Sequence, residues 1–505
     1  MSRYEYLHAS TVSRAGFCLP VSRALVFPEQ QVFEQMMSRY RLVPVYAQAK
    51  VPHLDLAQYF SKNCVDQPAC LLESMTGSDN GRYSIIAHRA LKQIISRLNN
   101  PQGIKLLREQ LQNYPAPGLE FPFFTGGLMG YWSYETGLAY HELPMSSGVK
   151  SIEQCFFIPA EVIVYDRFEQ EVTAIIWTDT KKAEPDLFAK ICRRLDNLLV
   201  EIVSNDYNIS RQVPKISAPH DLNADEGFIP SIDDIQFGMM VNKAGEYIRC
   251  GDIFQVVLSR SWSRNSSADP WQVYLNLRAL NPSPYMFYYA LPGFTLMGAS
   301  PEMQIRVQQG QVKTRPIAGT RKVTGVHEID QALSRELLDD DKERAEHLML
   351  VDLSRNDIGR VSRPGTVRVE KFMQVEKFSH VMHLVSDVEG EMLNELDALD
   401  AFQAGFPAGT LSGAPKRKAM QIIGELETSL RGPYGGAVGY VDFNGNLDSC
   451  IAIRGVLHYQ DKYYLQSGAG IVADSVPELE AMETFNKARA LMIAIKEAER
   501  LDSHD

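Results

Sequence analysis

The chain has 505 residues, of which 45% are hydrophobic, 22% charged and 10% aromatic, a composition typical of a folded globular protein rather than a disordered one. At about 150 residues per domain, this length predicts two or three domains. Acidic residues outnumber basic ones by 62 to 51, and the formal charge of -11 argues against nucleic acid or an anionic membrane as a partner.

The N-terminal region carries no clear targeting signal. Its first 26 residues contain arginines and serines but also Glu5, and they lack the apolar segment and cleavage site of a signal peptide. We treat residues 1–40 as an N-terminal extension, with organelle targeting as the alternative. No run of 18 apolar residues predicts a membrane span. The seven cysteines are scattered without a C-x-x-C pair, which predicts reduced thiols and a cytoplasmic protein.

The pattern along the chain indicates two folded regions joined by a connector. Residues 41–203 alternate β-rich runs such as AEVIVYDRF with helical stretches such as LFAKICRRLDNLLVEIV. Residues 204–232 are rich in Ser, Asn, Asp and Pro and predict a linker. Residues 233–505 combine several strands with helices, including an amphipathic terminal helix from Pro477 to Leu501. The fold class from pattern alone is α+β or α/β.

Two related strings, GGLMGY (126–131) and GGAVGY (435–440), occur once in each region. Both predict strands in which glycines permit a close approach of neighbouring backbones.

Two helical segments each carry an acid pair at i and i+3, and each pair faces one side of its helix. The pairs are Glu343 with Glu346, and Glu480 with Glu483. Such pairs are common on solvated helix faces, but the apolar run HLMLVDL after Glu346 favours burial, where a carboxylate needs a cation or a proton. If the two helices face each other, the acids form a hard-oxygen site suited to Mg²⁺.

Three segments poor in side-chain bulk predict an anion site. RPIAGT (315–320), AGTLSGAPK (408–416) and SGAGIV (467–472) are predicted loops with exposed backbone N–H groups. With Thr320, Thr410 and Arg454 they would bind an anion, and the absence of a Walker or Rossmann pattern favours a carboxylate over a nucleotide phosphate. Tight turns without a ligand are the alternative.

His383 lies in FSHVMHLVSDV, which alternates as a strand does. A strand histidine is either a core residue with satisfied hydrogen bonds or a catalytic base, and the pattern leaves both open.

Taken in order, the motifs resemble those of the chorismate-utilising enzymes, and most closely the large, aminating subunits of anthranilate synthases. The resemblance runs from Val43 to the terminal helix and includes LLESM (71–75), NPSPYMFY (281–288), GASPE (298–302), RPIAGT, ERAEHLMLVDLSRND (343–357) and AGTLSGAPK. It implies an α+β fold in which antiparallel β-sheets pack as a sandwich with surrounding helices.

The resemblance also implies roles for individual residues. Glu346 and Glu483 would bind Mg²⁺, with Glu343 and Glu480 beside them, and Glu302 would be the general acid. The implied catalytic residues are Glu302, His383, Thr320 and Gln255. The implied chorismate-binding residues are Gly319, Thr320, Tyr434, Arg454, Gly468, Ala469 and Gly470, the last three as a turn.

Two positions separate the related activities. Gln255 stands where water-using members of the family have a lysine base, and glutamine cannot accept that proton, so ammonia is the expected nucleophile. Ala318 stands where many aminodeoxychorismate synthases have a lysine that attacks the ring. The expected reaction is therefore Mg²⁺-dependent amination of chorismate and pyruvate elimination to anthranilate. Aminodeoxychorismate synthase component I and an inactive binding homologue are the alternatives.

The resemblance extends to regulation and to a partner. Ser74, Pro284, Tyr285 and Met286 match the tryptophan feedback site of the family, although LLES and NPSP also suit a strand end and a turn. No cysteine lies in a Gly-rich nucleophile loop, so a separate glutaminase subunit would supply ammonia and the expected assembly is a hetero-oligomer.

Overall fold

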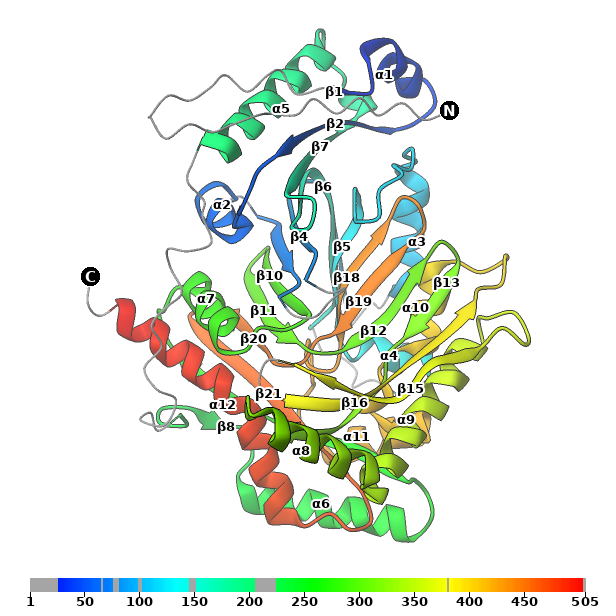
Figure 1. Ribbon diagram of the computed structural model, residues 1–505, viewed down its shortest axis with the longest axis vertical. Helices are drawn as coiled ribbons and strands as arrows, with labels where there is room; N and C mark the ends of the chain where they lie inside the picture. Colours follow the sequence, from blue (N-terminus) through cyan, green and yellow to red (C-terminus); the bar gives the residue numbers. More distant parts are fainter. Residues whose placement is uncertain are drawn as a thin grey trace.

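One branching antiparallel sheet organises the protein. The computed structural model describes residues 26–64, 67–75, 81–98, 102–144, 151–204, 224–378 and 381–502. Within these residues, antiparallel pairings connect 21 strands (Figure 1). Antiparallel strands can be joined by short turns, and strands that follow each other in the chain, such as β6 (Ile152–Asp166) and β7 (Glu171–Asp179) or β10 (Tyr285–Leu291) and β11 (Phe294–Ser300), pair in the sheet.

The sheet branches at β6 (Ile152–Asp166). The C-terminal half of β6 pairs with β7 (Glu171–Asp179), and its N-terminal half pairs with β5 (Gly127–Trp132). β4 (Tyr83–Arg97) follows the whole length of β6 on its other side. Beyond β7 lie β2 (Leu42–Lys50) and β1 (Val26–Phe27).

Two arms of strands leave this branch point. The first continues from β4 through β3 (Ala69–Glu73), β10 (Tyr285–Leu291), β11 (Phe294–Ser300), β20 (Gly455–Tyr459), β21 (Lys462–Ile471) and β9 (Gln255–Asn265), which also pairs with β8 (Ile229–Pro230) and β17 (Gly413–Ala414). The second continues from β5 through β18 (Ala437–Asp442), β19 (Leu447–Ile451), β12 (Met303–Gln308), β13 (Gln311–Thr314) and β16 (Val381–Glu391), which also pairs with β14 (Ile317–Lys322) and β15 (Arg368–Lys377).

The two arms pack against each other through a shared hydrophobic core. Phe287 and Leu296 of the first arm belong to the same buried cluster as Ile305 and Val438 of the second. Trp132, at the end of β5, is fully buried there. The predicted α+β fold with antiparallel sheets packed as a sandwich is confirmed.

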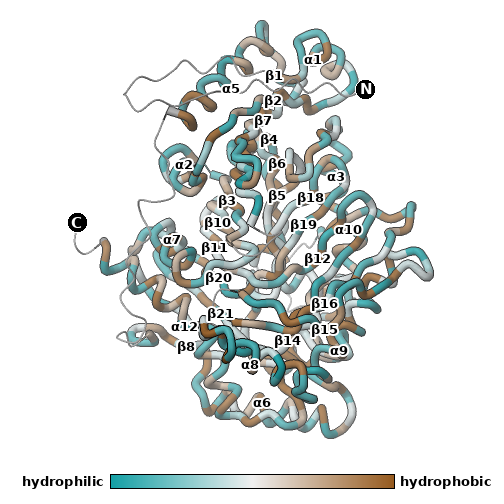
Figure 2. Tube along the Cα trace, in the orientation of Figure 1, coloured by the Kyte–Doolittle hydropathy of each residue, from teal (hydrophilic) through white to brown (hydrophobic). Residues whose placement is uncertain are grey.

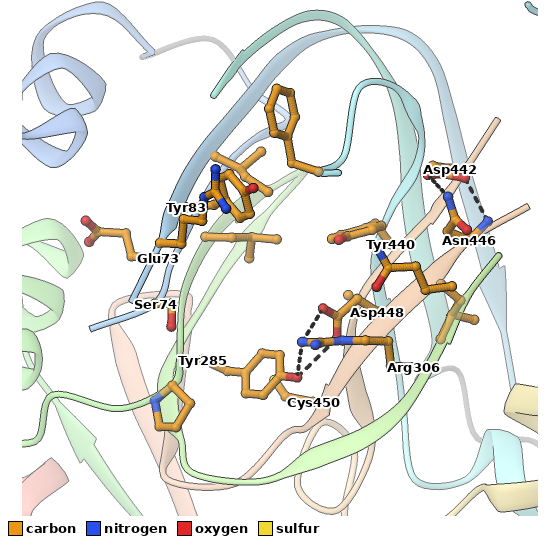
Figure 3. A pocket seen from close by; sticks show the side chains of 18 of the residues that line it. Glu73, Ser74, Tyr83, Tyr285, Arg306, Tyr440, Asp442, Asn446, Asp448 and Cys450 are labelled. Atoms are coloured by element: carbon orange, nitrogen blue, oxygen red, sulfur yellow. Dashed lines mark hydrogen bonds and ion pairs between the residues drawn. The ribbon is translucent and has the colours of Figure 1, made fainter. Parts of the chain in front are cut away.

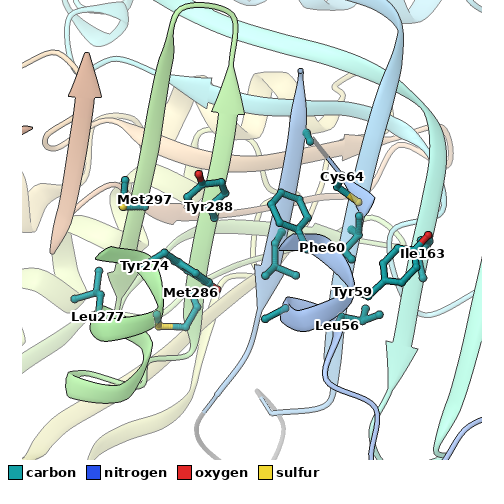
Figure 4. Close-up of a cluster of buried hydrophobic side chains, with 14 of the residues drawn as sticks. Leu56, Tyr59, Phe60, Cys64, Ile163, Tyr274, Leu277, Met286, Tyr288 and Met297 are labelled. Atoms are coloured by element: carbon teal, nitrogen blue, oxygen red, sulfur yellow. The ribbon is translucent and has the colours of Figure 1, made fainter. Parts of the chain in front are cut away.

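Helices cover the outer faces of both arms. Those packed on the first arm and on β2 and β7 are α1 (Gln30–Met37), α2 (Leu56–Asn63), α5 (Leu187–Ser204), α7 (Pro270–Leu280) and α12 (Pro477–Asp502). Figure 4 shows part of this layer, where Tyr59 and Phe60 of α2 and Tyr274 of α7 pack toward the strands. The predicted terminal helix is confirmed as α12, which begins with a proline, a favourable first helical residue.

The remaining helices pack around β9, at the far end of the first arm, and around the second arm. They are α3 (Gly103–Asn113), α4 (Thr136–Tyr140), α6 (Asp234–Arg249), α8 (His327–Asp339), α9 (Asp341–Gly359), α10 (Ala398–Gly405) and α11 (Lys416–Leu426), with the short 3₁₀ helices η1 (Thr180–Lys182) and η2 (Gly409–Leu411). Figure 2 shows hydrophilic and hydrophobic stretches alternating along covering helices such as α6, as expected for helices with one buried face. None of the described helices is long and apolar enough to cross a membrane.

The two glycine-containing strings form β5 and β18, and the two strands pair with each other. Gly130 lies opposite Gly439, and a Cβ atom at Gly130 would stand 2.0 Å from the Cys155 carbonyl oxygen of the next strand. The predicted strands and the predicted close backbone approach are thus confirmed.

Pairing of β5 with β18 and of β3 with β10 joins residues 41–203 to residues 233–505. The proposed linker at 204–232 lies largely outside the described residues, as do the first 25 residues of the expected N-terminal extension. The division into domains therefore stays a prediction.

Candidate active site

A buried carboxyl group lies between β11 and β12. The side chain of this residue, Glu302, accepts a hydrogen bond of 3.0 Å from Thr410 Oγ1, and its carbonyl accepts one of 3.0 Å from the Ile451 N–H. Burial raises the pKa of Glu302 to about 8, although the Thr410 hydrogen bond and the charge of Lys487 oppose the shift. Glu302 is therefore protonated at neutral pH and can donate a proton.

Acid side chains from α9 and α12 come together near the start of β9. Gln255 Nε2 donates a hydrogen bond of 3.3 Å to Glu346 Oε1. Burial, followed by the charge of Glu343, raises the pKa of Glu346, and Glu483 adds to the effect. Burial also raises the pKa of Glu480, with a further contribution from Glu483. The two acid pairs thus share one electrostatic environment.

This acid cluster fits a divalent cation bound partly by water. Within the described residues, no group of three or more His, Cys, Asp or Glu side chains is arranged to hold a metal ion by itself. Mg²⁺ commonly uses only one or two protein carboxylates and completes its shell with water and substrate oxygens. Burial, with a further contribution from the neighbouring Glu343 and Glu483, raises the pKa values of Glu346 and Glu480, and a cation would offset both effects. Glu346 and Glu483, one from each helix, are the residues suited to hold it.

Lys487, which the sequence analysis did not assign to the site, connects its parts. Its Nζ atom donates hydrogen bonds of 2.6 Å to Glu483 Oε1 and 3.0 Å to the Gly468 carbonyl. Its own carbonyl accepts a hydrogen bond of 3.2 Å from Arg454 Nη1. The position of Lys487 four residues after Glu483 was the one available signal, since i and i+4 residues are neighbours on a helix.

Arg454 supplies a positive charge beside the acid cluster. Burial lowers its pKa, while the charges of Tyr434 and Glu483 oppose this shift. Glu483 forms its ion pair with Lys487. The positive charge of Arg454 also acts on Tyr434, whose pKa burial raises. A half-buried guanidinium at this position favours an anionic ligand. An open cavity of about 350 Å³ adjoins it, lined by Arg454, Leu479, Met482, Glu483, Asn486 and Lys487.

The segment Gly468–Gly470 was predicted as a turn, and this prediction is wrong, because the segment lies inside strand β21. Strand alternation directs the fully buried Ala469 side chain into a hydrophobic core, so only its backbone can border the site. The glycines face the other way. A Cβ atom at Gly468 would stand 2.7 Å from Tyr434 Oη, and one at Gly470 would stand 2.6 Å from Gln255 Nε2. Both positions require glycine to leave room for these site side chains.

The segment RPIAGT likewise was predicted as a loop, but most of it forms strand β14. The strand pairing is irregular between Ala318 and Arg321, where Gly319 has a φ of +66°. This kink turns the Gly319 carbonyl toward β16, where His383 Nδ1 lies 2.7 Å from it.

His383 is held in a neutral form. Its Nδ1 atom donates to the Gly319 carbonyl and also lies 3.1 Å from Thr320 Oγ1, so Nε2 is left as a free acceptor. Burial lowers the pKa of His383, and the charge of Arg454 adds to the effect. The side chain is therefore able to accept a proton beside the Arg454 anion site.

A second cavity, of about 390 Å³, lies on the opposite side of β10 and β11 from their covering helix α7 (Figure 3). Ser74, Pro284, Tyr285 and Met286 all line it. The Ser74 hydroxyl is buried without a hydrogen-bond partner. Residues from two motifs more than 200 positions apart in the sequence thus line one pocket, as predicted.

Two charged residues of this pocket were missed. Arg306 pairs with Asp448 at 2.8 Å, and the Tyr285 hydroxyl donates to Asp448 Oδ1 at 3.1 Å. Arg306 Nη2 also donates to Tyr285 Oη at 3.1 Å. The side chain of Met286 instead packs with Tyr274 on the other face of β10 (Figure 4), so Met286 borders the pocket through its backbone.

Comparisons with known proteins place these features in a family. Residues 65–493 match the chorismate binding enzyme family. The chain is 40% identical to anthranilate synthase component 1 of Acetivibrio thermocellus, over 94% of this chain and 99% of that protein. It is 38% identical to anthranilate synthase component 1 of Aquifex aeolicus, over 92% of this chain and 97% of that protein.

Solved structures agree. Anthranilate synthase component I from Streptococcus pneumoniae superimposes with a TM-score of 0.72 at 34% identity, covering 88% of this chain and 99% of that one. The menaquinone-specific isochorismate synthase from Escherichia coli superimposes with a TM-score of 0.68 at 18% identity, covering 92% and 98%, which shows a shared fold alone.

Loss of the Thr410 hydroxyl is expected to raise the pKa of Glu302 above about 8, because that hydroxyl stabilises the ionised carboxylate. Infrared difference spectroscopy across a pH series of Thr410→Val, with the carboxyl band identified by its loss in Glu302→Gln, measures this shift. Thr366→Val, whose hydroxyl donates to the Arg363 carbonyl, serves as the control. An unchanged or lowered pKa in Thr410→Val contradicts the assigned hydrogen bond.

Proposed function

Because the chain belongs to the anthranilate synthase component 1 family of chorismate-binding enzymes, we propose that it catalyses the lyase reaction that converts chorismate and ammonia to anthranilate and pyruvate. The observation that carries this proposal is the buried carboxyl of Glu302, whose raised pKa keeps it protonated, in the same region as the half-buried guanidinium of Arg454. Chorismate is a dicarboxylate whose C4 hydroxyl leaves only with a proton, so it needs both an anion site and an acid.

Arg454 is the residue that binds one carboxylate of chorismate, and Gly468 and Gly470 leave space beside Tyr434 and Gln255, respectively. Gly319 and Thr320 approach from β14, with Thr320 Oγ1 close to His383. The neutral His383 Nε2 then faces the region of the ring as a proton acceptor. These contacts hold the substrate so that C4 meets the Glu302 carboxyl.

Mg²⁺ is the cofactor that the acid cluster supports, held by Glu346 and Glu483. When bound, it neutralises and orients the ring carboxylate of chorismate. Glu343 and Glu480 stand beside these ligands and keep the local potential negative.

Amination proceeds by addition of ammonia at C2 as the C4 hydroxyl takes the Glu302 proton and leaves as water. Gln255 lies beside this region and, unlike lysine, cannot deprotonate water, which supports ammonia as the nucleophile. Loss of pyruvate then makes the ring aromatic. We assign ammonia supply to a separate glutaminase subunit in a hetero-oligomer, which the name component 1 of the relatives supports.

The pocket that contains Ser74 and Tyr285 is the candidate tryptophan feedback site. Its aromatic walls suit an indole ring, and the unpaired Ser74 hydroxyl with the Arg306–Asp448 pair offers polar partners to an amino acid. The six cysteines in the described residues are free, which supports a cytoplasmic location.

The purified protein is expected to form anthranilate from chorismate, Mg²⁺ and ammonium, since all the groups for amination reside in this chain. Fluorescence of anthranilate measures the product, and Glu302→Gln serves as the inactive control. Glutamine in place of ammonium should yield none until a glutaminase is added. Formation of an aminated product that retains the enolpyruvyl group would instead identify an aminodeoxychorismate synthase.

Glu346→Gln and Glu483→Gln should each weaken Mg²⁺ activation by more than the roughly tenfold that loss of an outer-shell partner costs, because each removes a charge that faces the cation. The Mg²⁺ concentration for half-maximal turnover measures the change. Glu478→Gln is the matched control, since Glu478 is an exposed acid on the same helix as Glu483. Normal Mg²⁺ dependence in both test variants would show that Glu346 and Glu483 do not bind the cation and are ordinary acids on solvated helix faces.

Ser74→Leu should relieve tryptophan inhibition about tenfold or more, because the larger side chain occupies the pocket and removes a coupling of about 1–3 kcal/mol. A tryptophan titration at fixed chorismate measures the effect, and turnover without tryptophan should stay near that of the wild type. Ser61→Leu, at an exposed position on α2, is the control. Wild-type protein that is insensitive to millimolar tryptophan contradicts the effector assignment.

A further inference from the structure

A small, partly open cavity of about 40 Å³ adjoins the Glu302 carboxyl. Its polar lining comes from Glu302, Gln304, Thr314, Arg315, Ser354, Asp357 and Thr410. A buried water molecule needs roughly 10–15 Å³ of such volume, so the cavity has room for a short file of water molecules.

Three atoms of the lining residues are buried without a hydrogen-bond partner among the described residues. Arg315 Nε has an ion-pair contact of 3.3 Å with Asp387 Oδ1, whereas Gln304 Oε1 and Thr314 Oγ1 have no such contact. The amide of Gln304 cannot turn freely, because its Nε2 atom donates to the Gly405 carbonyl at 3.0 Å. Buried polar atoms of this kind are normally satisfied by ordered water, so the cavity is suited to hold it.

The cavity extends along α9 from the acid toward a buried ion pair. Leu350 and Asp357 both line it and are seven residues apart, which is about 10 Å along a helix. Lys416 Nζ donates to Asp357 Oδ2 at 2.7 Å and to the Gly405 carbonyl at 3.0 Å, and both charged side chains are more than nine-tenths buried. A charged acceptor, Asp357, therefore lines the same cavity as Glu302, and a proton donor, Lys416, is hydrogen-bonded to it.

We propose that water in this cavity returns to Glu302 the proton that it gives up in each turnover. The inference rests on the proposed function, in which the Glu302 O–H bond breaks, a new O–H bond forms on the C4 oxygen, and the C4–O bond breaks as water leaves. Glu302 is then an ionised carboxylate only 9% exposed, with substrate covering its open side. Its proton comes back along the water file past Ser354 and Asp357, and the ammonium formed at C2 releases one proton to solvent, so the proton count closes.

Thr314 and Ser354 are positioning residues in this proposal, and neither touches the substrate. Thr314→Val removes the hydroxyl at constant size, and Ser354→Leu narrows the cavity. Each should lower kcat about tenfold, less than the roughly 100-fold or more that loss of a general acid costs, with an unchanged KM for chorismate. The solvent deuterium isotope effect on kcat should rise, because proton return becomes slower than the other steps.

Thr173→Val is the matched control, since Thr173 is a buried threonine on β7 that lines none of the three cavities. A change in packing alone would not raise the isotope effect selectively. Wild-type values of kcat and isotope effect in Thr314→Val overturn the proposal even if Ser354→Leu fails to fold. A crystal structure with no water near Gln304 Oε1 and Thr314 Oγ1 overturns it as well. Failure of the wild type to form anthranilate would refute the proposed function instead.

Discussion

Antiparallel pairing between strands far apart in the sequence is the constraint on which the Ser74 pocket and the cavity beside Glu302 both depend. Gly130 and Gly439 face each other in β5 and β18, and a Cβ atom at Gly439 would stand 2.2 Å from the Asp448 carbonyl oxygen of β19. The close approach fixes β19 against β12, and Glu302 lies at the start of that pairing, where its carbonyl accepts the Ile451 N–H. A side chain at Gly130 or Gly439 would therefore push the strands apart and displace Glu302 with them.

Opposite environments give the acids of the site different roles. Burial keeps Glu302 protonated against the opposing charge of Lys487, whereas Glu346 and Glu480 also lie near further carboxylates. Arg454 adds a positive charge that interacts with Glu483. In the proposed function, the substrate dianion and a bound cation would balance these charges.

Much of this site could be predicted from local sequence patterns. The remainder depends on contacts between residues far apart in the sequence. The i, i+3 spacing of Glu343 with Glu346 predicted an acid face because helix geometry is set within a few residues. The Gly468–Gly470 segment was wrongly predicted as a turn, because glycine is common in turns. In the folded strand, Gly468 is needed to leave room for the Tyr434 side chain. Arg306 gave no signal, since its partner Asp448 is 142 positions away and only the folded sheet joins them.

Strand β19 connects the proposed effector pocket to Glu302. Asp448 and Cys450 line that pocket, and the next residue, Ile451, donates its N–H to the Glu302 carbonyl. An effector can inhibit only if it binds one arrangement of this strand more tightly than another. Because Asp448 is held by Arg306 and Tyr285, a ligand that draws on those partners changes how β19 is anchored. In the proposed function, such a change would reach the Glu302 backbone through its hydrogen bond from the Ile451 N–H, without contact between the effector and the substrate.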